Sequence, residues 1–295
     1  MSQIQPLSEE LQIITIDELN ENPLEINSKL NAFRAWIVGQ PHLRARIDDQ
    51  FLLQFLRSTE YDLTAAGKKL DNFFAFKTVV TNQLEFGRAK FWELYYLGII
   101  AVLPTPLNDN GPRLIYYRYL YSPDLYRIEE LIEMCNMVNE SLIKSDPYAG
   151  ISGVVYIFDM STVSLKHILQ YSLSVVKQLV MFYEKSLPLR IKEICFTNVP
   201  LAAEHLFKLL LPCLSKELRQ RVTICGKNME NLTRKIPQNY LPRECGGSNG
   251  SLAEVIKDYA MVLEAQRQYF EENSQYGTDE NLRQGVLDFD GLWQK

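Results

Sequence analysis

The pattern closest to a catalytic motif is Gly246-Gly-Ser-Asn-Gly250, which matches G-x-S-x-G. In α/β-hydrolases this pattern places a nucleophilic serine directly after a buried strand, and the triad histidine follows it in the sequence. Here the preceding Leu-Pro-Arg-Glu-Cys makes a poor strand, and all three histidines lie upstream of Ser248. A glycine-rich turn explains the pattern better, and a serine hydrolase acting through Ser248 is retained only as an alternative.

The other polar residues are not spaced for metal or nucleotide chemistry. His42, His167 and His205 are isolated from one another and lack the spacing of metal ligands. The chain has no G-x-x-x-x-G-K-[ST] loop and no G-x-G-x-x-G after a strand. Asp159 ends an apolar run without an evident acid or base partner, so we interpret it as a cap for the next turn. We therefore expect no catalytic residue, no metal and no cofactor.

An excess of apolar helical surface is the more unusual feature. Residues 165–185 are expected to form one helix with a broad apolar side, and residues 201–211 are apolar nearly all round the helix. A helix of the second kind is either fully buried or meets something apolar besides a sheet. Ordinary core packing still explains most of these residues one by one.

The elements that must position these helices alternate along the chain. Short apolar runs rich in β-branched or aromatic residues predict strands at 114–117, 153–158, 191–196 and 222–225. Helical stretches at 124–144, 165–185 and 201–211 separate these strands. This alternation predicts an α/β fold with a mostly parallel sheet.

Two further regions flank this alternation. Residues 27–97 read as helices throughout, with Asp62 as the cap of one of them, and Pro104 and Pro106 mark the boundary. A helix is expected over 252–272, followed by a polar, loosely held tail. We thus expect a helical region over 1–98, a larger domain over 99–272 and a tail over 273–295.

Composition limits the class of protein. The net charge of −5 argues against general nucleic-acid binding. No signal peptide is evident, and the odd number of cysteines, five, without a C-x-x-C pair indicates reduced thiols. No apolar run approaches the roughly 20 residues of a membrane-spanning helix. We expect a cytoplasmic monomer that associates only transiently with membranes.

Several segments together resemble one family. Leu241-Pro-Arg-Glu-Cys-Gly-Gly247 is similar to the LP-x-E-[YF]-GG ending of CRAL-TRIO lipid-transfer domains, which include the α-tocopherol transfer protein and the cellular retinaldehyde-binding protein. Further similar blocks, in the family's order, are Phe51–Arg57, Tyr61–Ala66, Gly153–Asp159 and Ser186–Pro200. Cys245 departs from the pattern because an aromatic residue is usual there, and the glycine often found after the strand aspartate is absent.

The resemblance implies a non-catalytic protein that binds a hydrophobic molecule, such as a tocopherol, a retinoid or a phospholipid, and exchanges it at membranes. Its sheet would floor an apolar cavity of several hundred Å³, the usual size of a ligand pocket. A scaffold for protein interactions with a vestigial cavity remains the main alternative. The pocket residues carried over are Phe158, Tyr171, Leu179, Phe182, Tyr183, Leu189, Ile191 and Ile194.

The resemblance also implies that residues 201–211 form a mobile gate that touches membranes, with Leu206, Phe207, Leu209 and Leu210 as gate residues. Tyr171, Phe182 and Tyr183 stand where tocopherol pockets have smaller aliphatic residues, which implies a different cavity shape.

The basic residues are concentrated in one section. Residues 185–235 carry ten Lys and Arg and four Glu, a net charge of +6, which leaves −11 for the rest of the chain. Such a polarised chain suits an anionic membrane surface, although a solvated basic face explains it equally well. By resemblance, Arg190, Lys192 and Arg221 match positions that bind phosphoinositide head groups. Glu217 occupies the remaining basic position, with Lys216 and Arg219 beside it.

Overall fold

The chain folds around one five-stranded sheet. The computed structural model describes residues 4–80, 84–226, 229–273 and 275–285. The strands follow the order β2-β3-β4-β5-β6; β2 pairs antiparallel with β3, and the remaining pairs are parallel. Their bounds are β2 Ile100–Val102, β3 Arg113–Arg118, β4 Val154–Asp159, β5 Ile191–Thr197 and β6 Val222–Gly226. The four predicted strands are confirmed, and β2 is an additional edge strand.

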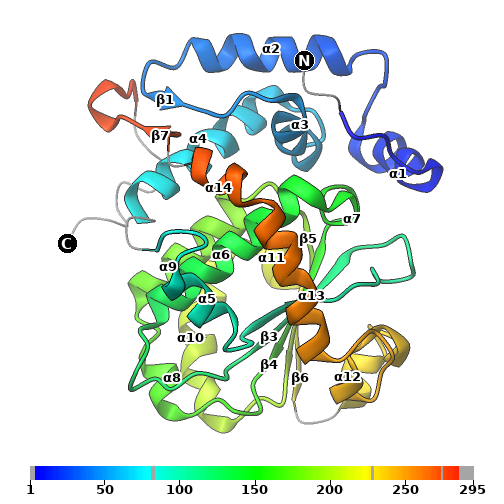
Figure 1. Cartoon of the computed structure of the whole chain (residues 1–295), viewed down its shortest axis with the longest axis vertical. Coiled ribbons are helices and arrows are strands. Elements are labelled where there is room, and N and C mark those ends of the chain that lie inside the picture. The colour runs from blue at the N-terminus through cyan, green and yellow to red at the C-terminus, as the bar shows by residue number, and fades with distance from the viewer. Residues whose placement is uncertain (1–3, 81–83, 227–228, 274, 286–295) are drawn as a thin grey trace.

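The N-terminal helices form a layer at the top of the molecule, above the sheet (Figure 1). They are α1 Glu9–Leu19, α2 Ile26–Val38, α3 Asp49–Ser58 and α4 Leu63–Val80, and α5 Ala89–Tyr95 follows them. The predicted cap is confirmed, because the Asp62 carboxylate accepts a hydrogen bond from the backbone N–H of Ala65 at 3.0 Å. Helix α1, which is capped by Ser8, was not predicted from the sequence.

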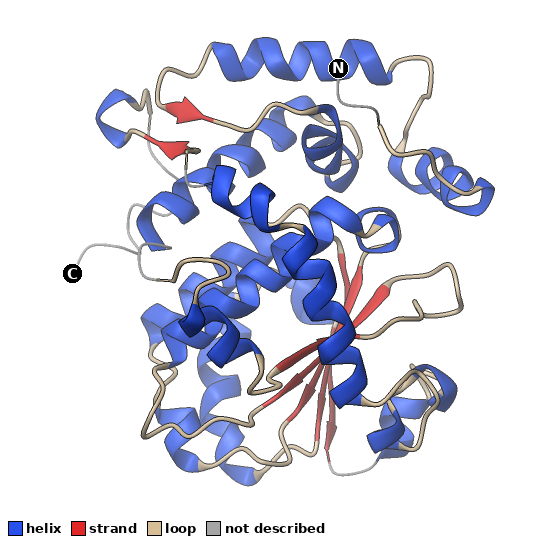
Figure 2. Ribbon diagram, in the orientation of Figure 1, coloured by secondary structure: helices blue, strands red, loops and turns tan. Residues whose placement is uncertain are grey.

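Helices cover both faces of the sheet (Figure 2). The long helix α13, Leu252–Ala265, crosses in front of the strands in Figure 1. The other helices of this part are α6 Ile128–Ser145, α7 Pro147–Ile151, α8 Leu165–Leu169, α9 Leu173–Val180, α10 Glu204–Cys213, α11 Lys216–Gln220, α12 Met229–Thr233 and α14 Arg267–Asn273. The short helical turns are η1 Met181–Ser186, η2 Leu201–Ala203, η3 Gln238–Tyr240, η4 Arg243–Cys245 and η5 Glu280–Leu282.

The expected single helix over 165–185 is wrong, because it divides into α8, α9 and the π-helical turn η1. The Ser172 hydroxyl accepts a hydrogen bond from the Val175 N–H at 3.2 Å, which starts a new helix. Gln170, in the break, donates from its side chain to the carbonyls of Pro123 and Tyr126. The expected helix over 252–272 likewise divides, at Gln266, into α13 and α14.

The described part of the expected C-terminal tail is held against the N-terminal layer. Strand β7, Gly277–Thr278, pairs antiparallel with β1, Leu43–Arg44. The Arg283 guanidinium forms ion pairs with Asp71 and Glu280. A loose tail was therefore the wrong expectation for residues 275–285, because backbone pairing and charge hold them; residues 286–295 lie outside the described residues.

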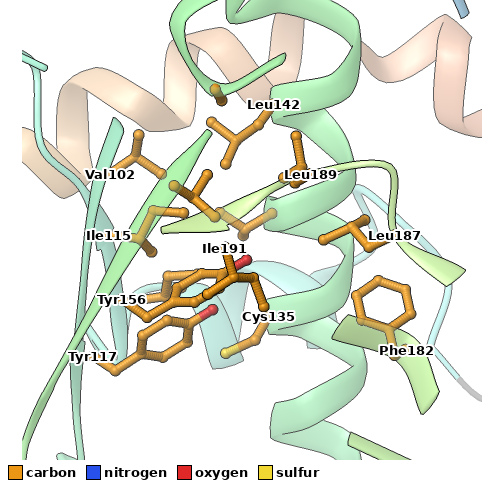
Figure 3. Packing of buried hydrophobic residues seen from close by; sticks show 14 of the residues in the cluster. Val102, Ile115, Tyr117, Cys135, Leu142, Tyr156, Phe182, Leu187, Leu189 and Ile191 are labelled. Carbon is orange, nitrogen blue, oxygen red and sulfur yellow. The ribbon is translucent and has the colours of Figure 1, made fainter. Parts of the chain in front are cut away.

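The core is continuous from the N-terminal helices to the sheet. Figure 3 shows side chains of β3 and β4, including Ile115, Tyr117 and Tyr156, facing α6, which contributes Cys135 and Leu142. Because successive strand residues point to opposite faces, Tyr117 and Ile115 share this face while Tyr116 faces the other way.

Candidate functional site: an apolar cavity between sheet and helices

An aromatic row lies across three strands. Tyr117, Phe158 and Phe196 are register partners on β3, β4 and β5. The Tyr117 and Phe158 rings stack with centroids 4.6 Å apart, and the Phe158 and Phe196 rings stack at 5.0 Å. Phe207 of α10 meets the last ring edge-on at 4.9 Å. These contacts make a rigid aromatic floor and fix one end of α10 to it.

A cavity with about 150 Å³ of free space lies between this floor and helices α6, α9 and α10. Its walls are almost entirely apolar, and η1 and α11 complete them. The free space is smaller than the several hundred Å³ expected from the family. Six tyrosines line it and occupy volume that aliphatic side chains would leave open: Tyr117, Tyr119, Tyr121, Tyr156, Tyr171 and Tyr183.

The structure brings together most of the expected pocket residues. Six of them line the cavity: Phe158, Tyr171, Leu179, Tyr183, Ile191 and Ile194. Phe182 and Leu189 lie outside its lining and are buried elsewhere in the core. Phe182 packs against Phe76 of α4 with ring centroids 5.1 Å apart, because consecutive residues of η1 point in different directions.

Several lining residues were missed in the sequence. Tyr117, Tyr156 and Phe196 share the sheet face of Phe158 and Ile194. The period-two alternation of the strands would have identified them. On α6, Ile128, Leu131, Ile132 and Cys135 recur at helical spacing and form another wall.

Burial keeps the tyrosine hydroxyls and the cysteine thiol of the cavity uncharged. It raises the pKa of Tyr117, Tyr156 and Tyr171 well above the usual tyrosine range. Burial also raises the pKa of the Cys135 thiol and of the Tyr183 hydroxyl. These groups therefore offer hydrogen bonds to a ligand but no charge.

Helix α10 closes one side of the cavity. Leu206 and Leu210 line it, while Phe207 packs on the floor and half-buried Leu209 lies outside the lining. Nearby, α8 is in contact with η2. Leu165, Leu169 and Leu201 of these two elements are exposed and form what we call the outer leucine patch.

The expected basic residues gather near the cavity end lined by Ile191, Leu218 and Val222, their neighbours in sequence. Arg190 and Lys192 both pair with Glu18 of α1; Lys192 Nζ lies 3.2 Å from the Glu18 carboxylate. Arg190 also donates to the Ile151 carbonyl. Although burial opposes ionisation of Glu18, its hydrogen bond to Lys192 and the two positive charges hold its pKa below the usual range.

The other three expected basic residues are more exposed than Arg190 and Lys192. Lys216, Arg219 and Arg221 are exposed. Arg219 donates to the Leu214 carbonyl at 3.2 Å, and Arg221 donates to the Ile191 carbonyl at 2.5 Å. Glu217 is exposed beside them. We use the name basic cluster for the five expected residues Arg190, Lys192, Lys216, Arg219 and Arg221; Glu18 of α1 is the acidic partner of the first two.

The remaining candidate groups have local structural roles. The Ser248 hydroxyl donates to the Asn239 carbonyl at 3.1 Å, and the turn η4 precedes it in place of a strand. Asp159 accepts from the Ser161 N–H at 3.0 Å, so the predicted cap is confirmed. It also accepts from Asn198 and from Tyr116, whose hydroxyl meets the Cys245 thiol.

The described residues include neither a candidate metal-binding group nor a candidate membrane-spanning helix. In the described ranges, no group of three or more His, Cys, Asp or Glu side chains is placed to hold a metal ion. None of the helices in those ranges is both long enough and apolar enough to cross a membrane.

Comparison with known proteins gives consistent relatives. The CRAL/TRIO domain family matches residues 99–247, and a Pinta-like UBA domain matches residues 22–83. The human "Alpha-tocopherol transfer protein-like" is 28% identical over 251 residues, covering 83% of this chain and 72% of that protein. Rat Clavesin-1 is 28% identical over 240 residues, covering 78% of this chain and 66% of that protein.

Among solved structures, the crystal structure of Sfh5 gives a TM-score of 0.49 at 11% identity, over 91% of this chain and 100% of that one. The family match spans half of the sequence and coincides with the sheet that floors the cavity. The chain belongs to the CRAL/TRIO domain family.

Proposed function

We propose that this protein binds one hydrophobic small molecule in the cavity and transfers it between membranes without catalysing a reaction. The observation that carries the proposal is the almost entirely apolar cavity between the aromatic floor and α10. The names of relatives such as "Alpha-tocopherol transfer protein-like" support transfer of a lipid. Tocopherol-like, retinoid-like and phospholipid-like molecules are the candidate ligands.

Burial of ligand hydrocarbon supplies the driving force, at roughly 25 cal/mol per Å² of apolar surface. The free space of about 150 Å³ equals that of an engineered protein cavity which binds benzene. A whole lipid is larger than this, so binding requires the walls to separate. Helix α10 is the wall we expect to move, because Leu209 and Leu210 are only partly buried.

The first prediction concerns ligand binding itself. The purified protein is expected to hold one apolar molecule per chain, detected by native mass spectrometry and lipid extraction. A ligand that binds only the folded state also raises the melting temperature. Retinoids, tocopherols, sterols and phospholipids should be compared. No copurified lipid, together with an unchanged melting temperature for all of them, would refute the proposal.

An anionic membrane surface is the second proposed partner. The basic cluster borders one end of the cavity, so a phosphoinositide-like head group bound there would sit beside the bound lipid. Each basic residue near an anionic leaflet contributes about 1 kcal/mol and is screened by salt. Glu18 competes with such a head group, because it already pairs with Arg190 and Lys192.

Two variants with opposite expected effects on vesicle binding test this surface. Replacing Arg190 and Arg221 with glutamate is expected to weaken cosedimentation with anionic vesicles at low salt, and less so at high salt. Glu18→Ala is expected to strengthen it by about twofold to fivefold, since one competing charge is removed. Binding of the apolar ligand in solution should persist in both.

The matched control for Glu18→Ala is Asp17→Ala, which removes the same charge from an exposed neighbouring position of α1. It should strengthen vesicle binding less than Glu18→Ala. Unchanged binding by the double glutamate variant would show that the basic cluster is only a solvated face. Equal effects of the two α1 variants would refute the specific competition by Glu18.

A further inference from the structure

A chain of hydrogen bonds runs along one wall of the cavity. The Tyr156 hydroxyl donates to the Asn139 side-chain carbonyl at 2.9 Å. The Asn139 amide donates to the Tyr117 hydroxyl oxygen at 2.7 Å, to the Cys135 carbonyl at 2.8 Å and, over a longer distance of 3.3 Å, to the Tyr183 hydroxyl oxygen. The Tyr117 and Tyr183 hydroxyls lie 3.2 Å apart. Figure 3 shows the oxygens of Tyr117 and Tyr156 side by side, facing α6.

The hydroxyl groups of this hydrogen-bond chain have a preferred direction of donation. The Tyr117 oxygen accepts the shorter of the two hydrogen bonds that Asn139 gives to tyrosines, so its own O–H is the more polarised and the better donor. The acceptor within reach is the Tyr183 oxygen. Each tyrosine has one hydroxyl proton, so the proton of Tyr183 is left over. Among the described residues, no acceptor for that last proton is found, and Tyr183 lines the cavity.

We propose that the Tyr183 hydroxyl selects the ligand, by donating a hydrogen bond to an oxygen atom of an uncharged lipid such as an alcohol, aldehyde or ketone. This assignment rests on the proposed lipid-binding function and makes it more specific. A buried polar group without a partner is costly, so a ligand oxygen at Tyr183 satisfies both molecules at once. A pure hydrocarbon leaves the Tyr183 donor unpaired.

A charged head group is disfavoured at this place. None of the side chains in this hydrogen-bond chain carries a positive charge; they are Tyr156, Asn139, Tyr117 and Tyr183. A buried carboxylate without a cation is very costly. Arg118 is the cation that lines the cavity. Burial lowers its pKa, whereas the nearby Glu244 and Asp159 charges oppose that shift and already attract its guanidinium. Its Nε donates to the Gly98 carbonyl at 3.1 Å.

Ligands with one hydrocarbon skeleton and different end groups test the assignment. Farnesol, farnesal, farnesoic acid and farnesene should be titrated by calorimetry, together with retinol, retinal and retinoic acid. The alcohol and aldehyde are expected to bind about threefold to tenfold more tightly than the hydrocarbon, which is the effect of one neutral hydrogen bond. The acids should bind more weakly than the alcohols. Tyr183→Phe should abolish the preference for alcohol over hydrocarbon, so that the two compounds bind with similar affinity.

Two further tyrosines act as controls. Tyr121→Phe also removes a hydroxyl from the wall, but that hydroxyl already donates to Gln170 at 2.9 Å, so the preference should remain. Tyr119 and Tyr171 form a second pair at 3.2 Å, which receives no amide hydrogen bond in the described structure. If Tyr171→Phe and not Tyr183→Phe removes the preference, the assignment to Tyr183 is wrong.

The outcomes distinguish the role of Tyr183 from lipid binding itself. Equal affinity of the unaltered protein for alcohol, aldehyde and hydrocarbon would overturn the role of Tyr183 and leave lipid binding intact. Tighter binding of the acids would overturn it as well and point to Arg118. Absence of binding for every compound of both skeletons would overturn this assignment, whereas the lipid-binding proposal would fall only if tocopherols, sterols and phospholipids also failed to bind and no lipid copurified.

Discussion

Arg57→Ala is expected to lower the free energy of unfolding by about 3–5 kcal/mol, as is typical when one partner of a buried ion pair is removed. The Arg57 guanidinium contacts both Glu21 carboxylate oxygens, at 2.7 and 3.0 Å. Both side chains are buried, and Tyr61 donates to the same carboxylate at 2.7 Å. Without Arg57 the Glu21 charge remains buried and uncompensated. Denaturant unfolding followed by circular dichroism measures the effect.

The pH dependence gives an independent check. Although burial opposes ionisation of Glu21, the hydrogen bond and charge of Arg57 hold its pKa below the usual range. A carboxyl with a lowered pKa stabilises the fold above its unfolded pKa, about 4.3 for glutamate. This contribution is lost as the pH falls through the folded-state pKa. The unaltered protein should therefore lose stability in acid, and Arg57→Ala should lose less.

A double variant serves as the control. Replacing Arg57 and Glu21 together with leucine removes both buried charges and is expected to recover much of the loss, because apolar pairs often replace buried ion pairs at little cost. A double variant as unstable as Arg57→Ala would show that packing, and not the unpaired charge, determines the loss. The pair joins α3 to the segment directly after α1, so it also helps to hold Glu18 beside the basic cluster.

The second large effect is expected at the outer leucine patch. Replacing Leu169 and Leu201 with aspartate should reduce binding to neutral vesicles by about 100-fold or more, since burial of each leucine side chain contributes about 1.5–3 kcal/mol. These side chains are 69% and 97% exposed, so the fold itself does not depend on their burial. Exposed leucines on two elements that contact each other, α8 and η2, suit a membrane contact. Vesicle flotation and lipid transfer between vesicles measure the effect.

Equally exposed residues elsewhere provide the matched control. Leu24, just before α2, and Val38, the last residue of α2, are 94% and 87% exposed. Replacing this pair with aspartate adds the same charge and removes comparable apolar surface, yet membrane binding should persist. An equal loss in both double variants would show a general charge effect and contradict docking through the patch. The melting temperatures of all variants should stay close to that of the parent.

The sequence by itself determined the four parallel strands of the sheet and the family. The runs at 114–117, 153–158, 191–196 and 222–225 form β3, β4, β5 and β6. They could be recognised because buried strands are apolar over their whole length and turn residues bound them. The Asp62 and Asp159 caps were also predictable, since each bonds to a backbone group within three residues of itself.

Local hydrogen bonds decided some features that helical periodicity obscures. The 165–185 stretch has a helical pattern, yet the Ser172 cap begins a new helix within it. The turn η1 then directs Phe182 toward α4 and Tyr183 into the cavity. Periodicity alone assigns both residues to one broad apolar side and does not separate them, and the family resemblance predicted both as pocket residues.

Only the tertiary structure decided which polar groups meet. Glu18 lies 172 residues before Arg190 in the sequence, so its competition for the basic cluster depends on how α1 packs. The chain from Tyr156 through Asn139 and Tyr117 to Tyr183 joins β4, α6, β3 and η1. The pattern of apolar residues along the sequence indicates which residues are buried. It contains no information on the donors and acceptors that neighbouring elements bring together, because hydrogen bonds require atoms within about 3 Å of each other.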